Sequence, residues 1–171
     1  MSSPIFEHIS MVALPKYFKE LSERIKNPLP MDKFYEFGIG EREISNSIRS
    51  HFEMESREEF QGCYVFTEGK ANKYVGISKT IIHRIRQHLK GVNYTHSSLA
   101  YKLAKEKLNL GLTSKENMRN PEFLNEFKLA QKRISTWGLS VVEILDPIEL
   151  YLFEVYASLE LKTTYNSFET H

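Results

Sequence analysis

The sequence has a single cysteine and no long apolar run, and each absence excludes a class of protein. Cys63 alone allows neither an internal disulfide nor a multi-cysteine metal site. No stretch approaches the roughly 18 consecutive apolar residues that a membrane-spanning helix needs. The first twenty residues lack the basic start and the sustained apolar region of a secretion signal. We therefore expect a cytoplasmic protein with no membrane partner.

The bulk composition is that of an ordinary globular protein. A length of 171 residues suits one domain, and a composition of 41% hydrophobic and 26% charged residues supports a packed core. The sequence contains no internal repeat and no low-complexity tract. The net charge of +1 does not identify a partner.

The distribution of charge is more informative than its sum. Residues 61–120 contain eleven Lys and Arg but only three Glu, and the flanking segments are acidic on balance. A basic middle segment is a plausible contact surface for a polyanion such as nucleic acid. Solvated helix faces would give the same pattern, so charge alone does not distinguish the two.

Residues 1–60 predict a helical cap or extension without catalytic chemistry. Residues 11–27 have apolar positions at helical spacing, and Pro28 and Pro30 end that helix. Residues 31–59 predict a turn followed by a short helix.

Residues 61–171 predict a second region with a different pattern. The segments CYVFTE and KYVGIS are short, aromatic and β-branched, with turn residues between them, which predicts a β-hairpin. We expect further elements at 80–89 (helix), 98–111 (helix), 121–135 (helix), 139–145 (strand) and 148–162 (helix). The fold class is therefore α+β, with a small, mainly antiparallel three-stranded sheet flanked by helices.

The hairpin and the next helix place polar groups together. Alternation along a strand puts Tyr64 on one face with Phe66. On the helix, Arg84 and His88 are separated by one turn and share a face. A guanidinium and an imidazole directed at tyrosines form a suitable arrangement for binding phosphate.

These residues resemble the GIY-YIG endonuclease family. Gly62-Cys63-Tyr64 followed by Tyr74-Val75-Gly76 is similar to the pair of strand motifs that names the family. In the family an arginine follows the second motif by about three helical turns, and Arg84 is ten positions after Tyr74 (84 − 74). His88 lies one turn later, where several members have a histidine.

The resemblance extends to the end of the chain. The family uses a carboxylate on a late helix and an asparagine near the end of the domain. Glu154 and Asn166, twelve positions apart (166 − 154), match those two positions. The resemblance covers Gly62–Asn166, is close to the bacterial nucleotide-excision-repair members in this last segment, and leaves residues 1–60 unassigned.

The resemblance implies a metal-dependent nucleic-acid phosphodiesterase, with DNA rather than RNA as the expected substrate. It implies a one-step hydrolysis in which Tyr64 deprotonates water, Arg84 holds the phosphate and Glu154 binds one Mg²⁺ or Mn²⁺. The Tyr74 hydroxyl would contact the phosphate or the water. His88 would donate to the phosphate or polarise Tyr64. The residues expected to contact nucleic acid are Lys73, Lys79, Arg86, His96, Lys102 and Lys105.

The residues themselves support some of these roles and leave others open. Glu154 interrupts an otherwise apolar helix face, where an unpaired carboxylate is costly to bury and a divalent cation would supply the missing charge. Tyr64 and Tyr74 are equally consistent with packing in a core. Asn166 is expected to bond to the backbone, and Cys63 to be a small core residue.

Two other functions fit the same sequence. The first is a catalytically inactive nucleic-acid-binding or regulatory module with this fold. The second is a nuclease module that a partner protein targets, because the chain shows no helix-turn-helix, zinc finger or basic arm. A zinc site at His83, His88 and His96 is disfavoured, since their spacing matches no zinc motif and no thiolate accompanies them.

Overall fold

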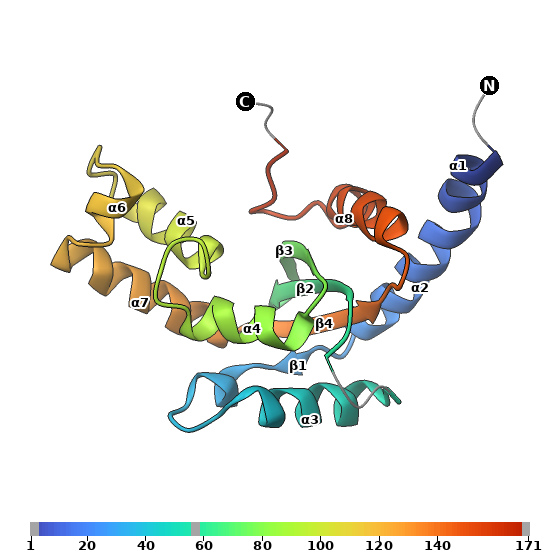
Figure 1. Cartoon of the computed structure of the whole chain (residues 1–171), viewed down its shortest axis with the longest axis horizontal. Helices are drawn as coiled ribbons and strands as arrows, with labels where there is room; N and C mark the ends of the chain where they lie inside the picture. Colours follow the sequence, from blue (N-terminus) through green and yellow to red (C-terminus); the bar gives the residue numbers. More distant parts are fainter. Residues whose placement is uncertain (1–3, 56–58, 169–171) are drawn as a thin grey trace.

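A computed structural model describes residues 4–55 and 59–168 of the chain, and its centre is one antiparallel sheet (Figure 1). Within these residues the sheet has four strands in the order β1-β4-β2-β3. Their bounds are Leu29–Pro30 (β1), Gly62–Glu68 (β2), Ala71–Ser78 (β3) and Gly138–Glu143 (β4). The α+β class is confirmed, but three strands was one too few. The added β1 has only two residues, too short for an alternating pattern to reveal it.

The predicted hairpin is present and is formed by β2 and β3. Tyr64 pairs directly with Gly76 across β2 and β3, and Phe66 pairs with Tyr74. The four positions therefore lie on one face of the sheet. The chain turns at Gly69, whose positive φ of 59° suits a residue without a side chain.

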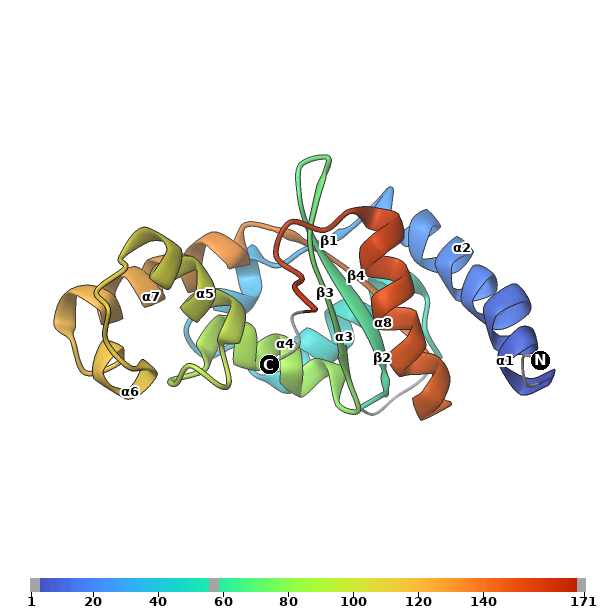
Figure 2. The same cartoon turned by 90° about the horizontal axis from the view of Figure 1, so that it is seen from above.

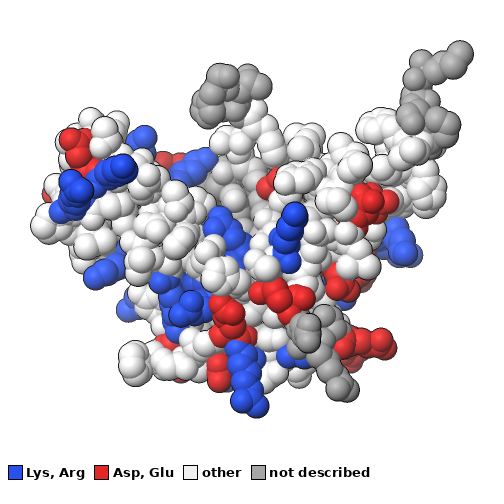
Figure 3. All heavy atoms as spheres, in the orientation of Figure 1, with Lys and Arg blue, Asp and Glu red and all other residues white. Residues whose placement is uncertain are grey.

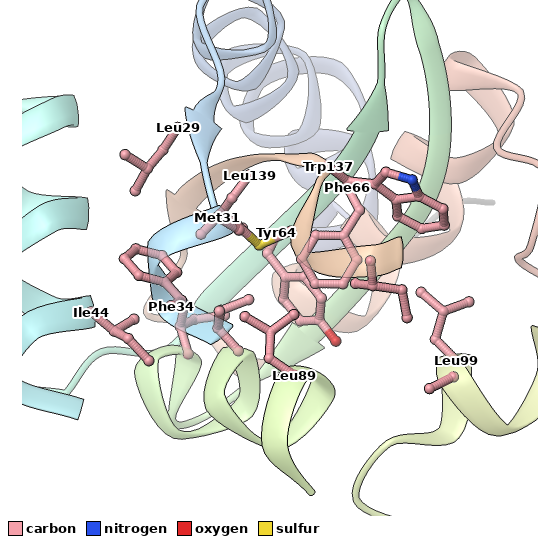
Figure 4. Packing of buried hydrophobic residues seen from close by; sticks show 14 of the residues in the cluster. Leu29, Met31, Phe34, Ile44, Tyr64, Phe66, Leu89, Leu99, Trp137 and Leu139 are labelled. Carbon is pink, nitrogen blue, oxygen red and sulfur yellow. The ribbon is translucent and has the colours of Figure 1, made fainter. Parts of the chain in front are cut away.

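The face that carries Tyr64 is covered by helices from both halves of the chain. Their bounds are Asp32–Tyr35 (η2, a 3-10 helix), Glu41–Phe52 (α3), Ile81–Lys90 (α4), Ser98–Lys107 (α5) and Pro121–Ser135 (α7). The ring of Tyr64 lies in this core beside Phe66 and Met31 (Figure 4). The hydroxyl oxygen points toward the side of the cluster on which Leu89 and Leu99 lie (Figure 4).

The opposite face is covered by α2 (Leu14–Ile25) and α8 (Pro147–Leu161). Cys63 and Val65 point to this side and are fully buried there, so Cys63 is the core residue that we expected. α2 continues a short helix, α1 (Pro4–His8), through a π-helical turn, η1 (Ile9–Ala13).

The N-terminal segment does not form a layer of its own. The two expected helices are present as α2 and α3, but they lie on opposite faces of the sheet. β1, which lies between them, pairs with β4. Residues 4–55 are therefore packed into the same sheet and cores as the rest.

The region after α4 differs in detail from the expectation. α5 ends at Lys107 rather than at Gly111. A short helix that we did not expect, α6 (Ser114–Asn117), follows, and Thr113 caps it through a reciprocal pair of hydrogen bonds with Glu116. α5 to α7 extend to one side of the sheet, with α8 on the other (Figure 1).

The C-terminal segment runs along the edge of the sheet. The amide of Tyr165 donates to the carbonyl of Lys73 at 2.9 Å, and that of Thr164 donates to Asn72 at 3.3 Å. The segment covers the open edge of β3 and passes between α5 and α8 (Figure 2). None of the helices in the described ranges has the length and apolar character to cross a membrane.

Candidate active site

The Tyr64 hydroxyl and the His88 imidazole form a buried hydrogen-bonded pair. The hydroxyl oxygen lies 2.6 Å from Nε2 of His88, and the two residues are 1% and 0% exposed. Nδ1 of His88 is buried and has no hydrogen-bond partner among the described residues. An unpaired acceptor is tolerated in proteins better than an unpaired N–H, so the tautomer with the proton on Nε2 is favoured. In that tautomer His88 donates to the Tyr64 oxygen.

Gly76 creates the space in which the Tyr64 ring lies. A β-carbon at position 76 would be 2.3 Å from both the ring carbon that bears the hydroxyl and the hydroxyl oxygen of Tyr64. Real side chains never approach so closely. Only glycine allows the two strands to pair with Tyr64 in this orientation, which explains the glycine of the second motif.

Arg84 is held beside the tyrosines by neutral groups. Its Nη1 donates to the carbonyl of His96 at 2.8 Å, and its Nη2 donates to the hydroxyl of Ser98 at 3.2 Å. The guanidinium makes no ion pair with a carboxylate in the described parts of the chain. It is therefore oriented while its charge is left available to an anion.

A cleft of about 390 Å³ opens at the edge of β3, and Tyr74, Glu154, Lys102 and Asn166 line it. Tyr74 connects the cleft to the buried pair, because its ring centroid is 6.2 Å from that of Tyr64. Neither Tyr64 nor Arg84 lines the cleft itself. The expected site residues are thus adjacent, with Tyr74 and Glu154 at the surface and Tyr64 beneath them.

Glu154 is half-buried, and its carboxylate makes no hydrogen bond or ion pair with any described residue. Among those residues, no group of three or more His, Cys, Asp or Glu side chains could enclose a metal ion. A magnesium ion beside phosphate commonly has one or two carboxylate ligands and completes its shell with water and phosphate oxygens. An unpaired carboxylate in a polar cleft fits that type of site.

Asn166 binds the backbone, as we expected. Its Nδ2 donates to the carbonyl of Val75 at 2.8 Å, and its Oδ1 accepts from the amide of Val75 at 2.8 Å. The hydroxyl of Thr163 donates to the same Oδ1. This side chain closes the ladder of β3 next to Tyr74 and keeps the C-terminal segment at the cleft.

Burial dominates the electrostatics of the four central groups. It raises the pKa of Tyr64 well above its usual value, an effect that Tyr74 increases and the Arg84 guanidinium opposes. It likewise raises the pKa of Tyr74 and of Glu154. Burial and the Arg84 charge both lower the pKa of His88 well below its usual value. His88 is therefore neutral, and the two tyrosines are protonated at neutral pH without a bound cation or anion.

The expected nucleic-acid residues do not all reach the cleft. Lys102 lines it and donates to the carbonyl of Tyr165 at 3.0 Å, and Lys105 is exposed one turn away on α5. Lys79 is exposed at the start of α4. Lys73 is paired with Glu68 at 3.0 Å, which neutralises its charge. Lys and Arg side chains border the central hollow of the molecule (Figure 3).

His96 and Arg86 do not line the cleft that contains Tyr74 and Glu154. The carbonyl of His96, rather than its exposed imidazole, contacts Arg84. Arg86 lies two residues after Arg84, on the other side of α4, and lines a separate cleft.

The sequence did not indicate Ser98 or Tyr165, which help to form the site. Ser98 orients Arg84, and Tyr165 lines the cleft and accepts from Lys102. No local pattern distinguishes this serine from a helix cap or this tyrosine from a core aromatic.

Comparison with models of known protein families, with curated proteins and with solved structures finds no match to this chain.

Proposed function

We propose that the protein is a metal-dependent nucleic-acid phosphodiesterase of the GIY-YIG type that acts as a DNA endonuclease. The observation that supports this most strongly is the convergence around Tyr74 of the Tyr64–His88 pair, the guanidinium of Arg84 and the carboxylate of Glu154, neither of which has an ion-pair partner among the described residues. A cation and an anion that both act on Tyr74, neither with an ion-pair partner among the described residues, suit a substrate phosphate together with a metal ion.

In this proposal Tyr64 takes the proton of the attacking water. Its raised pKa opposes this role, and two features of the chain favour it. The Nε2–H of His88 donates to the oxygen and stabilises the phenolate more than the phenol, and the positive charge of Arg84 acts in the same direction. Tyr74, at the cleft surface, would orient the phosphate or the water.

Arg84 would donate to non-bridging phosphate oxygens, where charge increases as the bond to the leaving group breaks. The bonds to His96 and Ser98 fix its orientation before the substrate arrives, which reduces the entropic cost of binding. Glu154 would hold a Mg²⁺ or Mn²⁺ ion, which when bound supplies positive charge for the leaving oxygen. Asn166 keeps the edge of β3 in place.

The decisive experiment incubates the purified protein with supercoiled plasmid, linear duplex, single-stranded DNA and RNA, with Mg²⁺, Mn²⁺ or a chelator. We expect metal-dependent nicking or cleavage of DNA, and its loss in Glu154→Ala. Glu160→Ala removes an exposed carboxylate from the same helix and serves as the matched control. Activity that survives in Glu154→Ala, or that is insensitive to the chelator, would contradict the metal assignment.

One observation favours a second candidate, an inactive nucleic-acid-binding module. Tyr64 is almost fully buried and does not line the cleft. For this function we expect binding of DNA that depends on Lys102 and Arg84, without cleavage under any metal condition. Cleavage at a rate that Tyr64→Phe lowers would eliminate this candidate.

A further inference from the structure

A second and larger cleft lies on the far side of α4 from Arg84. Its volume is about 830 Å³, and its walls are α4, α7 and the loop that follows η2. A cleft of this size is within the usual range for a site that binds a small ligand or a few side chains of a peptide. None of the proposed catalytic residues lines it, and of the residues expected to contact nucleic acid Arg86 alone does.

The walls of this cleft are largely apolar, and aromatic and aliphatic side chains stand at its mouth. Leu89 and Phe127 are buried at its base. Phe37 and Val92, at the rim, are 105% and 81% exposed. Two large apolar side chains at the rim of one cleft are costly to leave in water. An apolar group that fills the cleft would remove their apolar surface from water, which favours binding.

The loop at the rim is held in place before any ligand binds. Nζ of Lys90 donates to the carbonyls of both Glu36 and Ile39, across more than fifty residues of sequence. The chain between these carbonyls includes Gly38, whose φ of +83° allows the bend. A loop that is already ordered loses little entropy on binding.

The charged groups around the apolar walls are mainly positive. Arg86 and Lys128 are exposed, and neither makes an ion pair or a side-chain hydrogen bond with a described residue. Lys90 adds a third cation one helical turn from Arg86, and Glu36 is the one acidic residue among those described that lines the cleft. Arg86 and Lys90 repel each other at this spacing, so an anionic ligand would relieve an unfavourable contact.

We propose that this cleft binds a short acidic peptide segment of a partner protein, with a leucine or aromatic side chain in the cleft and Asp or Glu against Arg86 and Lys128. A nucleic acid is a poorer fit, because the edge of a base needs polar partners and the walls of this cleft are largely apolar. The side-chain amide of Gln131 already donates to the carbonyl of Gly91 and to Ser97. The proposal does not depend on the phosphodiesterase activity.

Three fluorescein-labelled synthetic peptides test the proposal by fluorescence anisotropy with the full chain. EELLWEE combines acidic and apolar side chains, KKLLWKK reverses the charge, and EESSGEE removes the apolar groups. We expect EELLWEE to bind at least about tenfold more tightly than either control peptide, since tenfold corresponds to 1.4 kcal/mol.

Two variants locate the binding. Arg86→Glu/Lys128→Glu should weaken EELLWEE at least about tenfold and strengthen KKLLWKK, because the charge of the rim is then reversed. Phe37→Ala should weaken EELLWEE several-fold without disturbing the fold, since this side chain is fully exposed. Lys16→Glu/Lys19→Glu makes the same charge change on exposed residues of α2 and should leave the affinity unchanged.

Three results would overturn the proposal. One is equal affinity for the three peptides. Another is unaltered binding in Arg86→Glu/Lys128→Glu while circular dichroism and the melting temperature show an intact fold. The third is displacement of EELLWEE by a single-stranded oligonucleotide, if that oligonucleotide also binds Arg86→Glu/Lys128→Glu more weakly than it binds the wild-type protein. That last result would identify a nucleic-acid site instead.

Discussion

The ring of Tyr64 lies across the α-carbon of Gly76, its direct partner in the adjacent strand, with its hydroxyl 2.6 Å from His88. The close approach of these two residues sets the position of the proposed general base.

Gly76→Ala should displace the Tyr64 ring, because the new β-carbon would lie 2.3 Å from it. We expect a loss of about 1–3 kcal/mol in the free energy of unfolding, as for other overpacked cores, together with loss of cleavage. Chemical denaturation and the plasmid assay measure the two effects. In a Tyr64→Ala background the same substitution should cost much less stability. If the losses of stability from Gly76→Ala and Tyr64→Ala simply add in the double variant, the ring and the new β-carbon do not collide.

Tyr64→Phe removes the hydroxyl and keeps the ring. If Tyr64 is the base, turnover should fall by roughly 10²–10⁴-fold while nucleic-acid affinity is largely retained. The wild-type rate should rise with pH until the phenol ionises, because the base acts in its deprotonated form, and the variant should lack this rise. Near-normal turnover in the variant would eliminate Tyr64 as the base without contradicting the fold.

Glu154→Gln should stabilise the metal-free protein at neutral pH. Burial raises the pKa of Glu154 in the folded state, so the folded protein binds this proton more tightly than the unfolded chain does. The charged form therefore lowers stability above the folded pKa, and the penalty disappears as the pH falls through it. A gain of about 1 kcal/mol would raise the melting temperature by roughly 2–4 °C in a chain of this length.

Melting curves with a chelator at pH 7.5 and at pH 4 test how the stability gain changes with pH. Glu160→Gln, on the exposed side of α8, is the control. The advantage of Glu154→Gln should be present at pH 7.5 and smaller at pH 4. An equal shift at both pH values would show that the substitution acts through packing and not through charge.

Asn166→Ala should loosen the edge of the sheet. The substitution leaves the amide and the carbonyl of Val75 without their partners, at a cost of about 1–3 kcal/mol if water does not replace them. Hydrogen exchange at the Val75 amide should become faster, and the amide of Val65 in the central strand β2 provides an internal reference. Unchanged exchange at Val75 would mean that the C-terminal segment does not hold β3.

Lys102→Gln/Lys105→Gln should weaken DNA binding for all sequences. The plot of log affinity against log salt concentration should also become less steep, by the amount that corresponds to the loss of up to about two phosphate contacts. Lys107→Gln is the matched control on α5, because Lys107 is already paired with Glu126 at 2.8 Å. A larger effect from Lys107 than from the double variant would place the nucleic acid elsewhere on the molecule.

The sequence determined the local elements and the short-range placement of several of the proposed site residues. Alternation in the two halves of the hairpin predicted β2 and β3, and i, i+4 spacing predicted that Arg84 and His88 would lie together on α4. The hydrogen bonding of the Asn166 side chain to the backbone was also predicted correctly. These features depend on periodicity and on short-range geometry, which the order of residues specifies directly.

Only the tertiary structure decided which residues meet across the chain. β1 joins the sheet through two residues that have no strand pattern of their own, because the hydrogen-bonding groups of β4 position them. Arg86 lies at a separate cleft, although it is two residues from Arg84, because a helix turns about 200° over that interval. Burial of Tyr64 and the closing of the cleft by the C-terminal segment both come from packing between distant segments, which no local sequence pattern records.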